Sequence, residues 1–494
     1  MNDRVRTIAV VGVLLLAALV VGATYWQAWA VGDLADKQDN AIQRIAQFTI
    51  DRGEIRAENT RPFARNKEKR VSGQTFYLRR YPTGKLAAAA VGYSTQARSR
   101  TGLERSMNDY LTASNSNLHT LISKTLDSLS GKTIKGNSLV LSLSPSAQFV
   151  ALRALDGNCG AAVAIQPKTG RVLVMATSPT YNPNLVESNF DRIGSIRGVN
   201  CRPPAPLLNR ATAGLYPPGS TFKLVTAAAA LDSGKFTPHS TFYDPGYCVE
   251  YGKPVKNFSD QNGPEVFGNV TLALGLQHSI NSVFCNIGKS LGALTVLDYA
   301  KRFGFYELPP LETPRDERRA SGLYKNGSLY RPAKGFQVDP GRLAFGQERL
   351  GVTPMQMAMV ASAIGNGGLL MKPHVVDRIL KPGGGVLQRT KLSELGRPIS
   401  PRTARELTAM MEAVVRAGTG TNAQIPGVRV AGKTGTAETG FSHRNTTWFV
   451  AFAPADNPQV AVAVTLENQS GTGGATAAPI AKSIMEALLH QPSS

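Results

Sequence analysis

The feature that most constrains the fold of this chain is an uncharged stretch near its start. It runs from Thr7 to Trp26 and follows Arg4 and Arg6. A helix of about 20 residues spans about 30 Å, the thickness of the hydrocarbon core of a bilayer. Because cytoplasmic flanks are rich in Lys and Arg, we expect the N-terminus in the cytoplasm. No second long apolar stretch follows, so the chain after Gly32 is expected outside the cytoplasm.

The alternative for this stretch is a cleaved signal peptide. The apolar run is longer than the roughly 7–15 residues typical of such peptides, and Ala23-Thr24-Tyr25 is a poor cleavage site. We therefore predict an uncleaved, single-pass anchor in the cell membrane.

The charge of the chain favours anionic surroundings, since the formal net charge is +21 over 494 residues. The sequence contains no zinc-finger spacing and no RNA-binding aromatic motif, so we predict no nucleic-acid partner. The densest basic run, 65–70, is short and includes Glu68, and we interpret it as a solvated loop. Given the anchor, an anionic membrane or cell wall explains the charge better.

The four cysteines are Cys159, Cys201, Cys248 and Cys285, and their spacing resembles no zinc site. In an oxidising compartment an even number suggests up to two disulfides, with three possible connectivities. We favour a bond between Cys248 and Cys285, because they flank a serine motif described below. Four buried free thiols are the alternative.

Composition divides the chain into three regions: 1–32 as tail and anchor, 33–136 as a polar pedestal or interaction domain, and 137–494 as the main domain. In the pedestal we expect a helix over 33–48, followed by short strands.

The main region has strands at both ends. Its start predicts a strand at 138–142, a helix capped by Ser144, and a hairpin of 161–165 with 171–176. From 207 to about 370 the pattern is mainly helical, with a buried helix over 353–362. Strands are expected again at 428–431, 447–452 and 460–464, before a closing helix over 478–489. This order predicts an α+β fold with one antiparallel sheet backed by helices.

A candidate nucleophile, Ser220, lies in the segment 217–223, which reads Pro-Pro-Gly-Ser-Thr-Phe-Lys. A serine hydroxyl is a weak nucleophile and needs a nearby base. No Gly-x-Ser-x-Gly elbow surrounds it, so an α/β-hydrolase is not expected. If the chain is helical from Thr221 onward, Lys223 shares a face with Ser220. Apolar neighbours would lower the pKa of this lysine, and the helix N-terminus would offer N–H donors to an oxyanion.

Two further motifs follow in order, Ser279-Ile280-Asn281 and Lys433-Thr434-Gly435-Thr436. Each has a plain alternative: a polar cluster for the first, and a strand end with an edge lysine for the second. Ser-x-x-Lys alone also fits a capped helix with an exposed lysine. Another Lys-Thr-Gly at 168–170 precedes Ser220 and is explained as a turn, so we expect no catalytic role for it. Together and in this order, the three motifs predict acyl transfer through a serine ester.

These motifs and their surroundings resemble class B penicillin-binding proteins, which are peptidoglycan transpeptidases. The matching segments are 215–223, 346–347, 353–358, 432–438 and 448–454 in the main region, and 52–55, 92–93 and 102–104 in the pedestal. The similarity covers nearly everything after the anchor. The modest length resembles the short actinobacterial type called penicillin-binding protein A.

The resemblance implies a serine β-lactamase-like transpeptidase domain and a role for each motif residue. Ser220 would be acylated by the D-Ala-D-Ala end of a stem peptide, with Lys223 as base and Ser279 as proton relay. The substrate-binding residues would be Asn281, Lys433, Thr434, Gly435 and Thr436, with backbone N–H groups of Ser220 and Thr436 as the oxyanion hole. The amine of a second stem peptide would form the cross-link, and β-lactams would acylate the serine. No cofactor or metal is implied.

Three alternatives share these features: a D,D-carboxypeptidase with water as acceptor, a β-lactamase, and a non-catalytic scaffold of the cell-wall machinery. The region 33–136 is too short for a glycosyltransferase, so glycan polymerisation is expected from a partner, beside divisome or elongation proteins. The chain departs from the family's common residues at Ile280 and at Ala57-Glu58-Asn59.

Overall fold

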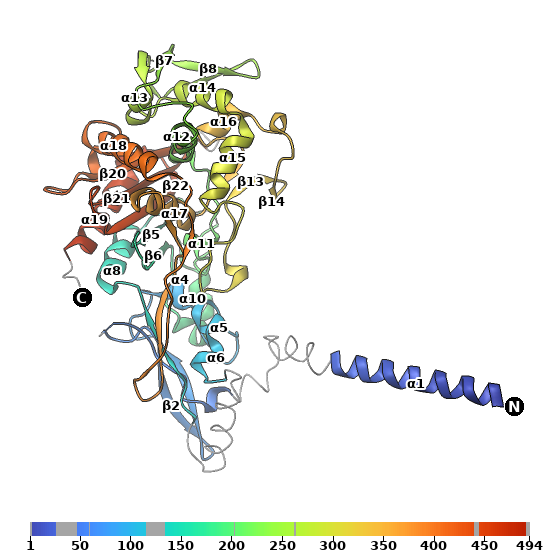
Figure 1. The fold of residues 1–494 in the computed structure, drawn as a ribbon. Helices are drawn as coiled ribbons and strands as arrows, with labels where there is room; N and C mark the ends of the chain where they lie inside the picture. Colours follow the sequence, from blue (N-terminus) through green and yellow to red (C-terminus); the bar gives the residue numbers. More distant parts are fainter. Residues whose placement is uncertain are drawn as a thin grey trace.

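The computed structural model describes residues 2–25, 47–58, 60–114, 134–201, 203–260, 263–438 and 444–490. Its first element is α1 (Asn2–Tyr25), in which Thr7–Thr24 is long and apolar enough to cross a membrane (Figure 1). No part of that span is buried against protein. The predicted helix over 33–48 lies almost entirely outside the described residues. Only its last two positions are described, and they belong to a 3₁₀ turn, η2 (Gln47–Thr49).

The pedestal consists of a long hairpin and short helices. Strands β2 (Arg65–Val71) and β3 (Gln74–Arg80) pair antiparallel over their whole length. The short helices are α4 (Ala88–Val91), α5 (Gly102–Ser106) and α6 (Asn108–Leu111). The basic run 65–70 is therefore strand, and its interpretation as a loop was wrong. Within this strand Asn66 is half-buried, and the other five residues of the run are exposed.

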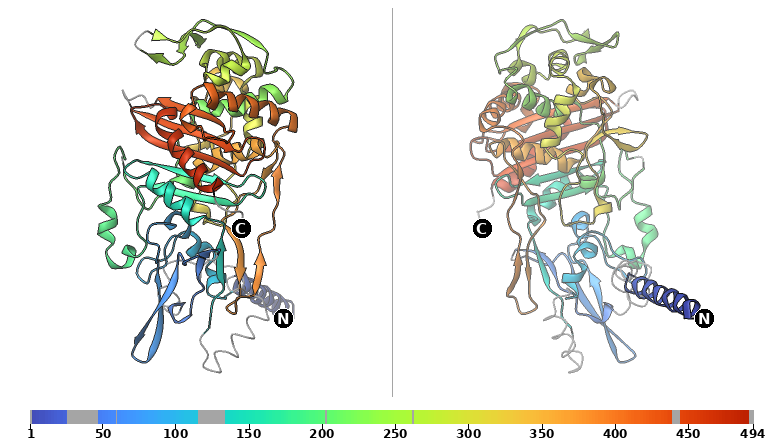
Figure 2. Two further views of the ribbon diagram at one scale, coloured as in Figure 1. Left: turned by 90° about the vertical axis from the view of Figure 1, so that its left-hand side faces the viewer. Right: turned by 45° about the vertical axis from the view of Figure 1, so that its right-hand side comes forward.

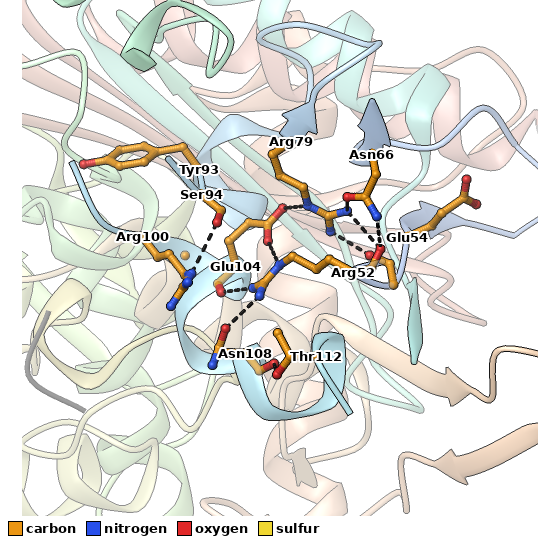
Figure 3. A network of polar contacts seen from close by, with 12 residues as sticks. Arg52, Glu54, Asn66, Arg79, Tyr93, Ser94, Arg100, Glu104, Asn108 and Thr112 are labelled. Atoms are coloured by element: carbon orange, nitrogen blue, oxygen red, sulfur yellow. Dashed lines mark hydrogen bonds and ion pairs between the residues drawn. The ribbon is translucent and has the colours of Figure 1, made fainter. Parts of the chain in front are cut away.

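A buried ion-pair network lies between this hairpin and α5 (Figure 3). The carboxylate of Glu104 accepts hydrogen bonds from Nε of Arg52 and from Nε of Arg79, both at 2.7 Å. Asn66 extends the network by accepting from Arg79 and donating to the carbonyl of Arg52. Burial alone would raise the pKa of Glu104, but Arg79 and Arg52 outweigh it and lower that pKa. The 52–55 and 102–104 motifs thus meet in one structural cluster.

A second sheet joins the pedestal to distant parts of the chain. Its order is β1 (Ile55–Ala57), β4 (Ser138–Leu141), β17 (Val376–Leu380) and β18 (Val386–Arg389). Figure 1 shows β17 and β18 as an orange hairpin that extends alongside the pedestal. The sheet crosses the division predicted at 136/137, and the domain boundaries remain a prediction.

The main domain is centred on a five-stranded antiparallel sheet, as the sequence predicted. Its order is β20 (Ala431–Glu438), β21 (Asn445–Ala453), β22 (Val460–Gln469), β5 (Gly160–Ile165) and β6 (Val172–Ser178). β22 pairs with β5, so strands from the two ends of the domain lie side by side at the centre (Figure 2). The strand expected at 428–431 is misplaced, since the strand begins at Ala431 and contains the Lys-Thr-Gly-Thr motif itself.

Helices cover both faces of this sheet because alternate strand residues form two apolar surfaces. Val163, Val450 and Ala461 belong to the core under α17 (Pro354–Gly365). Ala162, Ala451 and Val462 belong to the core under α8 (Pro145–Ala154) and α19 (Gly473–Leu489). The side chain of Ser144 accepts a hydrogen bond from the N–H of Ala147, which confirms it as the cap of α8.

The segment between β6 and α17 holds many short helices, including those that carry Lys223 and Asn281. They are α9 (Leu185–Ser188), α10 (Phe190–Gly194), α11 (Arg210–Ala213), α12 (Lys223–Asp232), α13 (Leu272–Gln277), α14 (Asn281–Leu291), α15 (Ala293–Arg302) and α16 (Pro340–Ala344). After α17 come β16 (Leu370–Met371), β19 (Glu394–Gly396) and α18 (Pro401–Ala417).

The same segment also contains many short strands, so its prediction as mainly helical was wrong in part. They are β7 (Thr241–Asp244), β8 (Tyr247–Glu250), β9 (Lys253–Lys256), β10 (Ser259–Asp260), β11 (Gly263–Pro264), β12 (Gly268–Thr271), β13 (Gly322–Lys325), β14 (Ser328–Tyr330) and β15 (Leu350–Gly351). Strands of two to four residues are too short to produce a clear alternation of apolar and polar residues.

The four cysteines form two disulfides, Cys159–Cys201 and Cys248–Cys285. The pairing favoured from the sequence is confirmed, and the alternative of four free thiols is wrong. Cys285 lies in α14 and Cys248 in β8, so the second bond attaches the β8–β9 hairpin to the helix that begins with Asn281.

Candidate active site

Ser220 lies in a tight 3₁₀ turn, η3 (Gly219–Phe222), directly before α12. With three residues per turn, a 3₁₀ helix aligns residues i and i+3, so Lys223 follows Ser220 on the same side. Gly219 has φ +50°, and a Cβ there would lie 2.9 Å from the carbonyl oxygen of Thr436. A glycine is needed here because the turn packs directly against β20.

Neighbouring elements hold this turn in place. The indole Nε1 of Trp448 donates to the carbonyl of Pro217 at 2.9 Å. The N–H of Gly219 donates to the carbonyl of Gly346, which belongs to the Gly-Gln segment noted in the sequence. The hydroxyl of Ser220 makes no hydrogen bond with any residue that the structure describes, so its oxygen is available to a substrate.

Lys223 is completely buried and reaches the second motif. Its Nζ donates to the carbonyl of Ser279 at 2.5 Å, to Oδ1 of Asn281 at 2.8 Å and to Oγ of Ser279 at 3.3 Å. It also lies 5.3 Å from the ring centroid of Phe284. The described contacts therefore join the first motif to the second, and they include no hydrogen bond between Lys223 and the hydroxyl of Ser220.

Lys433 reaches Ser279 from the five-stranded sheet. It is fully buried in β20, and its Nζ donates to Oγ of Ser279 at 2.8 Å and to the carbonyl of Thr434 at 3.0 Å. The hydroxyl of Ser279 thus lies between the ammonium groups of Lys223 and Lys433. Among the residues that the structure describes, no carboxylate forms an ion pair with either lysine.

The absence of a counter-ion has an electrostatic consequence. Burial, and then the charge of Lys433, lower the pKa of Lys223 well below its ordinary value. Burial lowers the pKa of Lys433 to about 7. Both burial and the charge of Lys433 therefore favour the neutral form of Lys223.

Ser279 occupies an uncommon backbone conformation, with φ +61° in the short loop between α13 and α14. Positive φ in a residue other than glycine is typical of functional sites when the surroundings impose it. Ile280, the residue that departs from the family's common choices, is buried in the apolar core. The lysine contacts of Ser279 and Asn281 are formed with isoleucine at this position.

The last motif places its threonines on the other face of β20 from Lys433. The hydroxyls of Thr434 and Thr419 lie 2.6 Å apart, and Oγ1 of Thr436 accepts from the N–H of Gly473 at 3.2 Å. A Cβ at Gly435 would lie 2.9 Å from the carbonyl of Pro218. Gly435 therefore allows the strand to pack against the turn that carries Ser220.

Sequence reasoning missed the residues that position Asn281. Oδ1 of Asn257 accepts from the backbone N–H groups of Asn281 and Ser282 at the start of α14. The buried carboxylate of Asp244 in turn accepts from Nδ2 of Asn257 and from the hydroxyl of Ser282. Asp244 and Asn257 belong to the short strands and turns that the sequence did not reveal, so no signal pointed to them.

The second Lys-Thr-Gly lies elsewhere. Lys168 is in the exposed turn between β5 and β6, and its Nζ donates to Oδ1 of Asn457 at 2.7 Å. Within the described residues, no group of three or more His, Cys, Asp or Glu side chains is arranged to hold a metal ion.

Two buried lysines that converge on Ser279, beside Ser220 at a helix start, form a candidate site for serine acyl transfer. Within the described residues, no histidine forms a hydrogen bond with these four side chains. Comparisons with known proteins agree with this class. The family model of the penicillin binding protein transpeptidase domain matches residues 160–486, and that of the penicillin binding protein A dimerisation domain matches residues 52–139.

Full-length relatives are similar over the whole chain. The peptidoglycan D,D-transpeptidase PbpA of Mycolicibacterium smegmatis is 32% identical over 509 residues, which cover 100% of both chains. The PbpA of Mycobacterium tuberculosis is 32% identical over 512 residues, or 99% of each chain.

Solved structures are also similar. Penicillin-binding protein A from M. tuberculosis, as a ceftriaxone acyl-enzyme complex, has a TM-score of 0.79 and 30% identity, covering 90% of this chain and 100% of its own. A D,D-transpeptidase domain from Eggerthella lenta has a TM-score of 0.74 and 32% identity, covering 89% and 98%.

The chain belongs to the penicillin-binding transpeptidase family and resembles its penicillin-binding protein A members throughout. It is a serine-type D,D-transpeptidase of peptidoglycan synthesis. The family and the α+β fold expected from the sequence are thereby confirmed.

Proposed function

We propose that Ser220 is the nucleophile of this transpeptidase and that Lys223 is its base. The observation that carries the proposal is the convergence of Lys223 and Lys433 on the hydroxyl of Ser279, next to the turn that holds Ser220. Of the two lysines, Lys223 has a pKa lowered both by burial and by its neighbour, which suits a group that must accept a proton.

In the first step, Oγ of Ser220 attacks the carbonyl carbon of the penultimate D-alanine of a stem peptide, and Lys223 takes the hydroxyl proton. The bond from that carbon to the terminal D-alanine nitrogen then breaks. Ser279 relays a proton from Lys223 to this nitrogen, and D-alanine leaves. The amine of a second stem peptide attacks the ester, loses its proton to the same groups, and restores the serine.

Binding of the substrate falls to the remaining motif residues. Lys433 supplies positive charge near the terminal carboxylate. The hydroxyls of Thr434 and Thr436, on the other face of β20, bind this carboxylate across the open edge of the strand after exchanging their present partners. Asn281 holds the substrate amide, and Gly435 keeps the strand close to the serine. Backbone N–H groups of Ser220 and Thr436 stabilise the oxyanion, since donors fixed in advance favour the transition state.

We further propose a single-pass topology, with residues 1–32 as tail and anchor, and with 33–136 and 137–494 outside the cytoplasm. Two disulfides support that location, because such bonds persist in oxidising compartments. A glycosyltransferase and proteins of the division or elongation machinery are the expected partners, with the pedestal as a binding surface.

The test is the intact mass of the full chain in detergent after incubation with benzylpenicillin, followed over time and mapped by peptide digestion. We expect a persistent adduct on Ser220, and none in the Ser220→Ala variant. Lys168→Ala is the matched control, because it removes the lysine of the other Lys-Thr-Gly, and it should be acylated at the normal rate.

Labelling of Ser220→Ala elsewhere in the site would remove Ser220 as nucleophile. An adduct that forms and quickly disappears would indicate a β-lactamase, and complete absence of an adduct would favour a scaffold. Incubation of the enzyme with a stem peptide, with and without an acceptor amine, separates cross-linking from carboxypeptidase activity.

A further inference from the structure

The outer face of the pedestal hairpin carries cations without counter-ions. On its inner face, Asn66 and Arg79 belong to the network around Glu104 (Figure 3). On its outer face, Arg65, Lys67 and Arg80 are exposed. None of these three side chains forms an ion pair or hydrogen bond with any residue in the described part of the chain.

Two of these cations are placed against each other. Arg65 and Arg80 are direct partners in the β2–β3 ladder. Side chains at such positions start about 4.5–5.5 Å apart, and like charges there destabilise the pairing. The repulsion between Arg65 and Arg80 contributes nothing to the stability of the hairpin. An anion bound between the two guanidinium groups would offset it.

The cations also line a pocket. Together with Arg61 they surround a cavity of about 560 Å³ at the side of the hairpin, and its other lining residues are Asn66, Tyr81, Pro82 and Asn184. None of the lining residues is acidic. The wall is fixed, because Asn184 exchanges two hydrogen bonds with the backbone of Tyr81.

A second pocket, of about 450 Å³, adjoins the basic one and shares Lys67, Arg80, Tyr81 and Asn184 with it. Phe48, Leu78 and Pro183 form an apolar part of its lining, which also includes the carboxylates of Glu68 and Glu187. A ligand that occupied both would place an anionic group among the cations and an apolar group beside them.

We propose that this pedestal site binds a phosphate-bearing ligand, with Arg61, Arg65, Lys67 and Arg80 around the phosphate. Arginine pairs bidentately with phosphate oxygens, and three arginines beside a lysine suit a phosphate monoester or a pyrophosphate. A lipid headgroup and a soluble phosphate share this chemistry, and the apolar part of the adjoining pocket predicts that the lipid binds more tightly. The site is separate from the acyl-transfer chemistry and does not depend on the roles proposed for Ser220 and the lysines.

The test uses the full chain in an uncharged detergent, titrated by calorimetry with inorganic pyrophosphate and with dihexanoyl phosphatidic acid at constant ionic strength. We expect saturable binding of both, tighter for the lipid, and at least a tenfold loss of affinity in Arg65→Gln/Arg80→Gln. The matched control is Arg70→Gln/Lys85→Gln, which removes the same charge from exposed positions that line neither pocket. It should bind normally, and both variants should acylate normally with benzylpenicillin.

Equal affinity for the two probes would support the site and assign it to soluble phosphates. No saturable binding of either probe, or equal loss in both variants, would overturn the proposal.

Thermal melting gives a second measurement. Without ligand, Arg65→Gln/Arg80→Gln should melt higher than wild type, because the cross-strand repulsion is gone, and ligand should no longer raise its melting temperature. A lower melting temperature with unchanged ligand binding would mean that the two arginines serve folding, and would also overturn the proposal.

Discussion

The pedestal and the active site each bury two cationic side chains, and they treat them in opposite ways. In the pedestal, Arg52 and Arg79 share the carboxylate of Glu104. In the active site, Lys223 and Lys433 share only the neutral hydroxyl of Ser279. Arginine stays charged and forms fixed, forked hydrogen bonds, whereas buried lysine readily changes its pKa. The arginine pair therefore stabilises the pedestal, and the lysine pair can exchange protons.

The largest effect expected from this comparison concerns the base. Lys223→Ala should slow acylation by benzylpenicillin by roughly 10²–10⁴-fold, the usual loss when a general base is removed. Lys223→Arg should be equally slow, because arginine keeps the charge but does not release its proton. The acylation rate constant is measured by mass spectrometry of samples quenched at successive times. A near-normal rate in either variant would reject Lys223 as base.

The second prediction concerns the pedestal pair. Glu104→Gln leaves two buried guanidinium groups without a counter-ion, which should lower the free energy of unfolding by roughly 3–5 kcal/mol. Denaturant unfolding measures this loss. Asp316→Asn is the control, since it breaks the exposed pair with Arg105 and should cost less than about 1 kcal/mol. A similar small cost at both sites would show that the network is dispensable.

The third prediction is that the buried charge of Lys433 lowers the free energy of unfolding. The pKa of Lys433 is about 7 when folded and 10.5 ordinarily, so below pH 7 the folded state bears the full cost of burying the charge. That cost shrinks as pH rises from 7 towards 10.5. Lys433→Met should therefore melt several degrees higher than wild type at pH 6–7, and the difference should narrow by pH 9. A lower melting temperature at pH 7 would contradict this account.

The smallest expected effect lies in the pH profile. Acylation needs a neutral Lys223 and a charged Lys433, so its rate should fall above about pH 7, where Lys433 loses its proton. Lys433→Arg keeps the positive charge, so its falling limb should disappear above pH 7. Rate constants between pH 5 and 9 test this, and an unchanged falling limb in the arginine variant would assign that limb to another group.

Local sequence determined much of this protein. The N-terminal apolar helix, the hairpin of β5 and β6, the cap at Ser144 and the buried helix α17 follow from composition, periodicity and turn residues that act over a few positions. The order of the three motifs, with their family resemblance, also predicted the class of enzyme. Such features depend on neighbours along the chain, so they can be read without coordinates.

Tertiary structure decided the rest, because it depends on contacts between distant segments. Only folding brings Lys433 within 2.8 Å of Ser279, 154 positions earlier, and surrounds both lysines with an apolar core that lowers their pKa values. The support of Asn281 by Asn257 and Asp244 comes from short strands with no periodic signal. The basic run 65–70 is a strand with exposed cations only because β3 pairs with it. The carboxylate of Glu104 in α5 is shared by Arg52 and Arg79, so it neutralises none of the cations in the run.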